Sequence, residues 1–148
     1  MLEIKTKTFQ EFTTEELYKI LQLRSEVFVL EQDCVYQDID NKDQSALHII
    51  GTKNGEIVAY TRIFAPGLYF KDASIGRVVV KQSERKYGYG KVVMEASIKA
   101  VKTHFNQIKI HISAQEYLIK FYTSLGFKQV GEGYLEDNIP HVGMVKDS

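Results

Sequence analysis

The chain has 148 residues, which is close to the size of one average domain, and 44% of them are hydrophobic. Lys and Arg number 19, as do Asp and Glu, so the formal net charge at pH 7 is zero. This balance argues against a nucleic-acid groove built from a strong overall positive field. The single cysteine excludes an intrachain disulfide, and no cysteine cluster offers a metal site. The N-terminus lacks a signal-peptide pattern, and no apolar run reaches membrane-spanning length. We therefore expect one soluble, cytoplasmic domain over residues 1–148, without a membrane partner or a metal.

The first third of the chain predicts a strand, a helix and a loop. Residues 1–9 are rich in Ile, Thr and Phe, which favours a strand. Thr13 and Glu16 form a capping-box pattern that opens a helix. The apolar face of this helix is interrupted at Arg24. Residues 31–45 are polar and acidic and predict a loop.

A hairpin and a buried strand are predicted next. The runs 46–53 and 56–65 are separated by the pair Asn54-Gly55, which accepts positive φ at both positions and so favours a type I′ turn. The β-branched run I-G-R-V-V-V at 75–80 is typical of a buried strand.

The second half of the chain alternates between helical and strand patterns. Two helices are indicated by apolar stripes, which consist of Met94, Ile98, Val101 and Phe105 in the first and of Leu118, Phe121, Tyr122 and Leu125 in the second. Gly126 supplies the stop of the second helix. Strands are expected at 108–114, at about 127–135 and at 141–146. The predicted order βα-βββ-α-β-α-ββ indicates an α/β domain with a mixed sheet.

The unit that joins a strand, a loop and a helix over residues 75–105 is the strongest candidate for a binding site. Arg85 and Lys86 precede two glycines, Gly88 and Gly90, at the point where the helix begins. Free N–H groups and the helix dipole favour an anion such as a phosphate there, and glycine lets the backbone approach the ligand closely. Taken alone, the pattern is equally compatible with a plain glycine turn.

Two familiar phosphate motifs are excluded at this loop. The dinucleotide fingerprint requires a third glycine where this chain has Val93. The P-loop requires Ser or Thr after Gly90-Lys91, and this chain has Val92.

The motif V-x-x-x-x-R-x-x-G-x-G (80–90), followed by F-Y-T-S-L-G-F (121–127), resembles the GCN5-related N-acetyltransferase (GNAT) superfamily. Further segments, in chain order, are similar to its ElaA branch. They are L-Q-L-R-S-E-V-F-V-L-E-Q (21–32), Y-Q-D-I-D (36–40), I-G-R-V-V-V (75–80), A-Q (114–115) and I-P-H-V-G-M (139–144). Together they span nearly the whole chain.

The resemblance implies an acyl-CoA N-acyltransferase fold with acetyl-CoA as co-substrate. In GNAT enzymes the strand before the loop is bulged, and the pantetheine arm pairs with its backbone, here at Val78 and Val80. The pyrophosphate would be held by Arg85, Lys86, Tyr87, Gly88, Tyr89 and Gly90, with Lys91 nearby. The thioester would lie where the two central parallel strands separate, and an amine would attack it directly.

The resemblance also implies catalytic roles. The N–H of Val80 is the candidate oxyanion donor. Tyr122 matches the family's usual acid for the departing thiolate and would also contact the cofactor; without the resemblance, a core tyrosine is the simpler interpretation. The glutamate that many GNAT enzymes carry near the position of Gly76 is absent. His111, His141 or a chain of water molecules remains as the base, and a structural role is the alternative for each histidine.

The acceptor site is predicted from the first helix, the acidic loop and the last hairpin. Its candidate residues are Arg24, Tyr36, Asp38, Asp40 and Arg77. The acidic loop either attracts a cationic amine or is simply solvated. Because a buried arginine is costly unless paired, the arginines that interrupt apolar elements require partners, which are expected to be Glu31, Asp38, Asp40 or a substrate carboxylate.

We expect an N-acetyltransferase that moves acetyl from acetyl-CoA to a primary amine of a small molecule or peptide, in a ternary complex. Whether the chain is a monomer or a homodimer stays open. The alternative is an acyl-CoA-binding sensor or regulatory domain with little turnover. The missing strand glutamate favours that alternative, whereas the retained Tyr122 opposes it.

Overall fold

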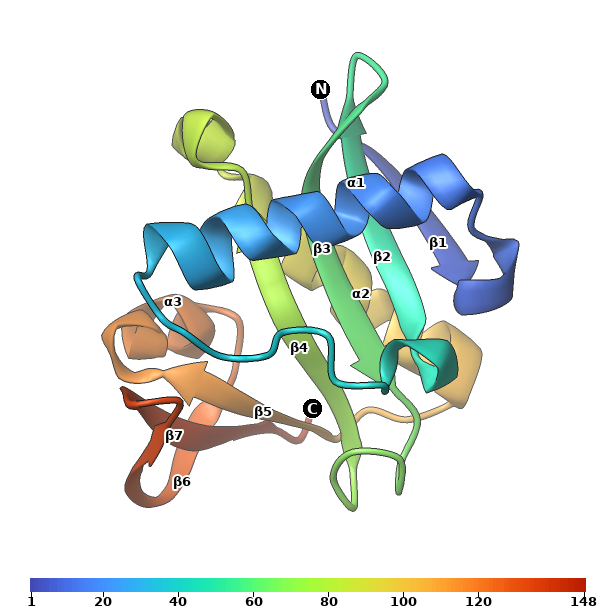
Figure 1. Cartoon of the computed structure of the whole chain (residues 1–148). Coiled ribbons are helices and arrows are strands. Elements are labelled where there is room, and N and C mark those ends of the chain that lie inside the picture. The colour runs from blue at the N-terminus through green and yellow to red at the C-terminus, as the bar shows by residue number, and fades with distance from the viewer.

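The computed structural model describes all residues 1–148 and contains one mixed sheet of seven strands. The strands are β1 (Glu3–Thr8), β2 (Leu47–Lys53), β3 (Glu56–Phe64), β4 (Ala73–Val80), β5 (Ile110–Gln115), β6 (Lys128–Glu136) and β7 (Ile139–Lys146). Their spatial order is β1-β2-β3-β4-β5-β7-β6, and β4 with β5 is the parallel pair (Figure 1). The predicted fold class and element order are confirmed.

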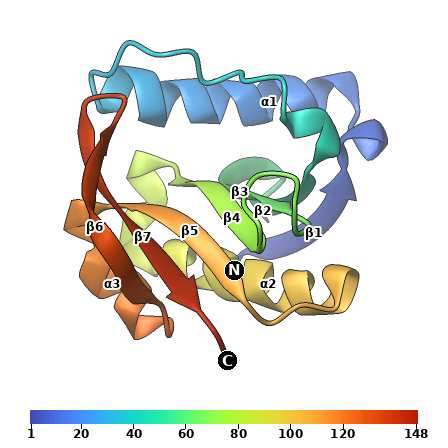
Figure 2. The ribbon, with the colours of Figure 1, turned by 90° about the horizontal axis from the view of Figure 1, so that it is seen from below.

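Helices cover both faces of the sheet. The helices are α1 (Thr14–Arg24), α2 (Tyr89–Phe105) and α3 (Ile119–Ser124). Figure 2 shows α1 on one side of the sheet and α2 with α3 on the other. Each face therefore has its own apolar cluster, and the larger, with 16 buried residues, lies under α2 and α3. None of these helices is long and apolar enough to cross a membrane.

Helix α1 begins at the predicted capping box. The Glu16 N–H donates to Thr13 Oγ1 at 3.0 Å, and the Thr13 N–H donates to Glu16 Oε1 at 2.9 Å. Helix α1 ends at Arg24, and the chain continues directly into a π-helix over Ser25–Glu31. The helical path is thereby longer than α1 alone, and the residues that follow Arg24 reach the edge of the cavity described below.

Strand β4 carries a bulge at Arg77. The register with β3 shifts at this point, and Arg77 adopts φ 50°, a region that non-glycine residues rarely occupy. Arg77 Nε donates to Asp38 Oδ1 at 2.6 Å, and Nη2 donates to the Asp38 carbonyl at 3.0 Å, so two hydrogen bonds hold the strained residue. The bulge implied by the family resemblance is confirmed.

The predicted turns are also found. Asn54 and Gly55 have φ of 52° and 81°, as a type I′ turn requires. Gly126 has φ 98° directly after α3, and Gly88 has φ 74° directly before α2. The run 75–80 differs from its prediction: it is a strand, but only Ile75 and Val79 are fully buried. The other four positions are part-exposed because the strand borders a cavity.

Candidate active site

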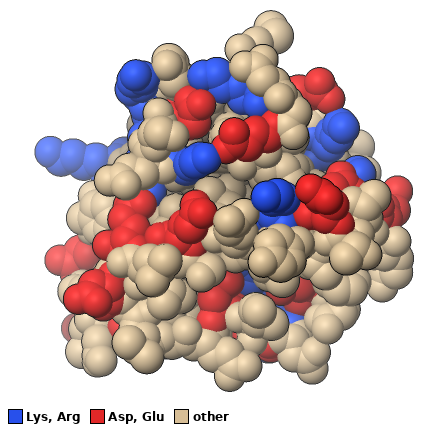
Figure 3. All heavy atoms as spheres, turned by 45° about the horizontal axis from the view of Figure 1, so that its top comes forward, with Lys and Arg blue, Asp and Glu red and all other residues tan.

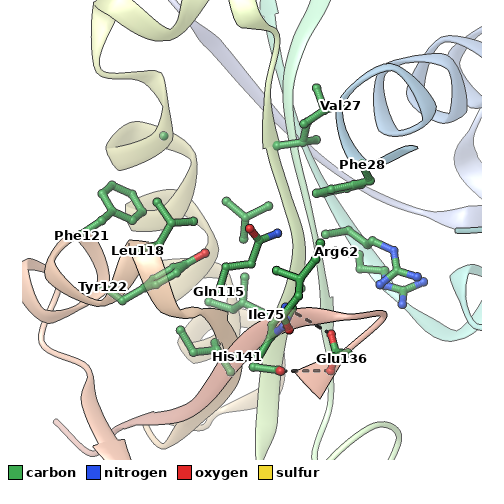
Figure 4. A pocket seen from close by; sticks show the side chains of 18 of the residues that line it. Val27, Phe28, Arg62, Ile75, Gln115, Leu118, Phe121, Tyr122, Glu136 and His141 are labelled. Atoms are coloured by element: carbon green, nitrogen blue, oxygen red, sulfur yellow. Dashed lines mark hydrogen bonds and ion pairs between the residues drawn. The ribbon is translucent and has the colours of Figure 1, made fainter. Parts of the chain in front are cut away.

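A cavity of about 540 Å³ opens between β4 and β5 and continues under the loop that follows α1. Apolar side chains such as Phe28 and Leu118 line its walls together with polar groups such as Gln115 and Glu136 (Figure 4). On the face shown in Figure 3, basic and acidic side chains are interspersed, so neither sign of charge dominates that face.

The cavity exists because the two parallel strands pair only at their beginnings. Ala73 pairs with Ile110 and Ser74 with His111, and no pairing continues beyond them. Residues 75–80 of β4 therefore face β5 without a partner strand, and both Val78 and Val80 line the cavity. Unpaired strand edges are where an extended ligand can add hydrogen bonds to the backbone.

The glycine loop lies at one end of the cavity. Arg85, Gly88, Gly90 and Lys91 all line the wall there. Helix α2 begins at Tyr89, so its first N–H groups have no partner within the helix and point towards this end. This arrangement fits an anionic ligand.

Arg85 is not free in this arrangement. Its Nη1 and Nη2 donate to the two carboxylate oxygens of Glu31 at 2.5 and 2.8 Å, and Nε donates to the Val80 carbonyl at 3.1 Å. Glu31 was expected to pair with a buried arginine, but its partner is this half-exposed one. This ion pair connects the end of the π-helical segment Ser25–Glu31 to the glycine loop.

Three residues of the predicted pyrophosphate loop do not line the cavity with their side chains. Tyr87 is half-exposed, and Lys53 and Lys86 stand 4.1 and 5.3 Å from the centre of its ring. The Tyr89 side chain is buried beside Tyr87. The roles predicted for Lys86, Tyr87 and Tyr89 therefore rest on their backbone groups alone.

Tyr122 lies in the wall opposite β4, at 6% exposure, and points into the cavity (Figure 4). Burial raises the pKa of the Tyr122 phenol above its usual value, so the hydroxyl keeps its proton at neutral pH. A protonated phenol across the cavity from the unpaired edge of β4 is able to act as a proton donor.

The two candidate histidines differ in position. His141 is buried and lines the cavity. His111 lies on β5 with its ring stacked on Phe70 at 4.2 Å between centroids, and its side chain is not part of the cavity wall. The structure therefore brings His141 together with Tyr122 and Val80, and it leaves His111 apart from them.

The predicted acceptor residues form a network of charges beneath the cavity. Arg24 bonds to Asp38 and Asp43 at 2.9 Å each, and Arg77 bonds to Asp38. Arg62 bonds to Asp40 at 2.5 Å and to Asp43 at 2.9 Å.

The expected pairing of buried arginines with Asp38 and Asp40 is thus confirmed, and Asp43 is a third carboxylate that the sequence analysis missed. Burial alone would raise the pKa of the Asp40 carboxyl, but the hydrogen bonds and charge of Arg62, with the charge of Arg77, lower it to about 2.

This network fixes the loop after α1 rather than presenting free charges to a ligand. Arg24, Asp38 and Asp40 do not line the cavity, whereas Tyr36, Arg62 and Arg77 do. The Tyr36 hydroxyl lies 3.3 Å from Asp38 Oδ1. Arg62 Nε and Ser74 Oγ are buried without a hydrogen-bond partner in the chain.

The same network makes His48 a source of acid sensitivity. Its ring nitrogens contact the Tyr60 hydroxyl at 2.5 Å and the Asp43 carbonyl at 2.9 Å, and burial lowers its pKa to about 4. The unfolded chain takes up this proton near pH 6.5, so it binds more protons than the folded chain between pH 6.5 and 4. The contribution of His48 to the free energy of unfolding is therefore present above pH 6.5, and it is lost as the pH falls from 6.5 to 4.

We expect the free energy of unfolding, measured with urea, to be about 2 kcal/mol lower at pH 5 than at pH 7. His48→Gln keeps a donor and an acceptor but does not titrate, so its loss over the same interval should be much smaller. An equal loss in both proteins would show that another group is responsible.

Glu136 is a cavity residue that the sequence analysis did not single out. It ends β6, and the turn residues Asp137 and Asn138 both have positive φ. In the β6–β7 hairpin, Tyr134 is the partner of His141, so their side chains lie on the same face of the sheet. Glu136 is two residues after Tyr134 and therefore lies on this face as well. The Asp-Asn pair was the available signal, because it is a two-residue turn sequence of the type I′ class.

Comparison with known proteins agrees with this site. Residues 8–148 match the family model described as an acetyltransferase (GNAT) domain. The chain is 40% identical to protein ElaA of Escherichia coli over 99% of this chain and 97% of that protein. It is 41% identical to a UPF0039 protein of Schizosaccharomyces pombe over 97% and 95% of the two chains.

Solved structures give the same result. The crystal structure of Escherichia coli ElaA matches with a TM-score of 0.92 at 39% identity, covering 99% of this chain and 100% of that one. An acyl-CoA N-acyltransferase from Pseudomonas aeruginosa matches with a TM-score of 0.93 at 38% identity, covering 99% of both chains. The chain therefore belongs to the GNAT acetyltransferase family. The predicted similarity to its ElaA branch is confirmed.

Proposed function

We propose that this protein transfers an acetyl group from acetyl-CoA to a primary amine of a small molecule or peptide, by direct attack in a ternary complex. The observation that carries the proposal is the unpaired edge of β4 beyond Ser74, which faces a cavity with the N-terminus of α2 at one end. Family membership supports an acyl-CoA donor.

The residues present fit such a donor. The backbone of Val78 and Val80 offers hydrogen-bonding groups to an extended arm, and the N-terminus of α2 offers N–H groups to a diphosphate. A Cβ at Gly88 would meet no other atom within 4 Å, so this position borders open space that a ligand can fill.

Two groups of the chain would then act on the thioester. The Val80 N–H stabilises the oxyanion that forms as the amine attacks. Tyr122 donates its proton to the departing thiolate, and a donor of this kind typically contributes about 10²–10⁴-fold to the rate. Both Val80 and Tyr122 line the cavity, which supports these two roles.

Thermal unfolding with four ligands tests the donor assignment. A ligand present at 100 times its Kd adds about 2.7 kcal/mol to the free energy of unfolding and raises Tm. We expect a rise with acetyl-CoA and with CoA and none with NAD or ATP. No rise with either CoA species at millimolar concentration would contradict the proposed donor.

A further inference from the structure

We propose that Glu136 and His141 together form the site that receives the acceptor as an ammonium ion, with His141 removing its proton and Glu136 holding the charge. This inference rests on the proposed function and adds to it a substrate class, an amine that is cationic in solution. Both side chains line the cavity and lie next to each other (Figure 4).

The hydrogen bond of His141 fixes which of its nitrogens is free. Nδ1 lies 2.7 Å from the carbonyl oxygen of Ile139, which only accepts hydrogen bonds, so Nδ1 carries the proton in the neutral ring. The lone pair is therefore on Nε2. Because the ring is buried and stacked on Tyr134, this orientation is held by packing as well.

Glu136 is oriented by a chain of hydroxyl groups. Ser113 on β5 donates to Glu136 Oε1 at 3.1 Å, and since a hydroxyl has one proton, the Tyr134 hydroxyl is the donor in its contact with Ser113. The other oxygen, Oε2, lies 3.5 Å from His141 Nε2. Two acceptors, a carboxylate oxygen and an imidazole lone pair, thus face each other.

An ammonium group between these two acceptors would satisfy both of them. It carries three donors, so it can donate to Nε2 and to Oε2 at once, and its charge compensates that of the carboxylate. Beside a neutral His141, no other cation of the chain pairs with Glu136. The nearby arginines, Arg62 and Arg77, are bonded to Asp38, Asp40 and Asp43. The remaining charged group in this part of the wall is Asp137, which is also acidic.

The proton balance of the step is simple. The ammonium gives one proton to His141 Nε2, which leaves a neutral amine and an imidazolium beside Glu136. The C–N bond then forms at the thioester carbonyl and the C–S bond breaks. As the amide forms, nitrogen loses its second proton, which passes through solvent to Tyr122 and restores the proton that Tyr122 gave to the thiolate. His141 finally returns its proton to solvent, so each turnover releases one proton.

The tautomer can be tested without activity. In protein labelled with ¹⁵N-histidine, long-range ¹H–¹⁵N spectra at pH 8 should show the resonances of His141 as a neutral ring protonated on Nδ1. His141→Gln identifies the signal by its disappearance. A ring protonated on Nε2 would have no lone pair towards Glu136 and would overturn the inference.

Kinetics test the division of roles. With the best acceptor among spermidine, 2-phenylethylamine, tyramine and lysine amide, we expect Glu136→Gln to raise the KM of the amine about 10–100-fold with little change in kcat. His141→Gln should lower kcat about 10²–10⁴-fold. The KM of acetyl-CoA should not change in either variant. Glu132→Gln and His104→Gln, both at exposed positions, are the matched controls.

The two proposals fail in different ways. Wild-type protein that acetylates none of these amines would contradict the proposed function. Wild-type activity that survives unchanged in Glu136→Gln and His141→Gln would overturn the ammonium site alone. Loss of acetyl-CoA affinity in step with kcat would show that the pair is structural, and it would overturn the inference as well.

Discussion

Replacing Tyr122 with Phe should lower kcat by about 10²–10⁴-fold while leaving the affinity for acetyl-CoA nearly unchanged. The substitution removes only the hydroxyl, and the ring that packs on Phe121 and Phe127 stays. Without the phenol, the thiolate departs unprotonated, and that step becomes slow. Steady-state kinetics, with Kd for acetyl-CoA measured by calorimetry, give the two quantities separately.

A matched control for this substitution is Tyr18→Phe, which removes the same hydroxyl at an exposed position of α1. Its kcat should equal that of the wild type. If Tyr122→Phe retains full kcat, or loses affinity for acetyl-CoA as much as it loses kcat, Tyr122 is not the acid.

Gly88→Val should weaken acetyl-CoA binding by at least about 100-fold, an effect of about 3 kcal/mol. Gly88 has φ 74° and lines the cavity at the start of α2. A β-branched side chain there occupies the space next to the helix N–H groups, and it also strains the backbone by about 1–3 kcal/mol.

The strain can be separated from the loss of space with a second variant. Gly55 has φ 81° in the β2–β3 turn and, like Gly88, has no atom within 4 Å of an added Cβ, but it does not line the cavity. Gly55→Val should lower Tm to a similar extent without affecting Kd. Normal affinity for acetyl-CoA in Gly88→Val would refute the assignment of the glycine loop.

Local patterns in the sequence predicted most of the fold. The Thr13–Glu16 capping box, the Asn54-Gly55 turn and the Gly126 helix stop depend on residues close together in the chain, and the structure has each of them. The bulge in β4 followed from the family resemblance, since Arg77 gives no local signal for positive φ.

The pairing of charges could be predicted only in part. Burial of an arginine requires a carboxylate, but the sequence does not say which one, because the partners lie far apart in the chain. Arg85 bonds to Glu31, which is separated from it by 54 positions, and Asp43 bonds two arginines at once. The partial exposure of four residues in the run 75–80 was not predicted for a related reason, since hydrophobicity alone does not reveal a cavity beside a strand.

Direct transfer of the acetyl group to an amine can be tested by analysis of the reaction products. Wild-type protein is incubated with acetyl-CoA and with each of the four amines named above. The concentration of free CoA thiol is measured over time, and the masses of the products and of the protein are determined by mass spectrometry. We expect one N-acetylated amine for each CoA released and no acetylated intermediate of the protein. Release of CoA without an acetylated amine, or an acetyl-protein that forms and decays at the rate of turnover, would rule out direct transfer.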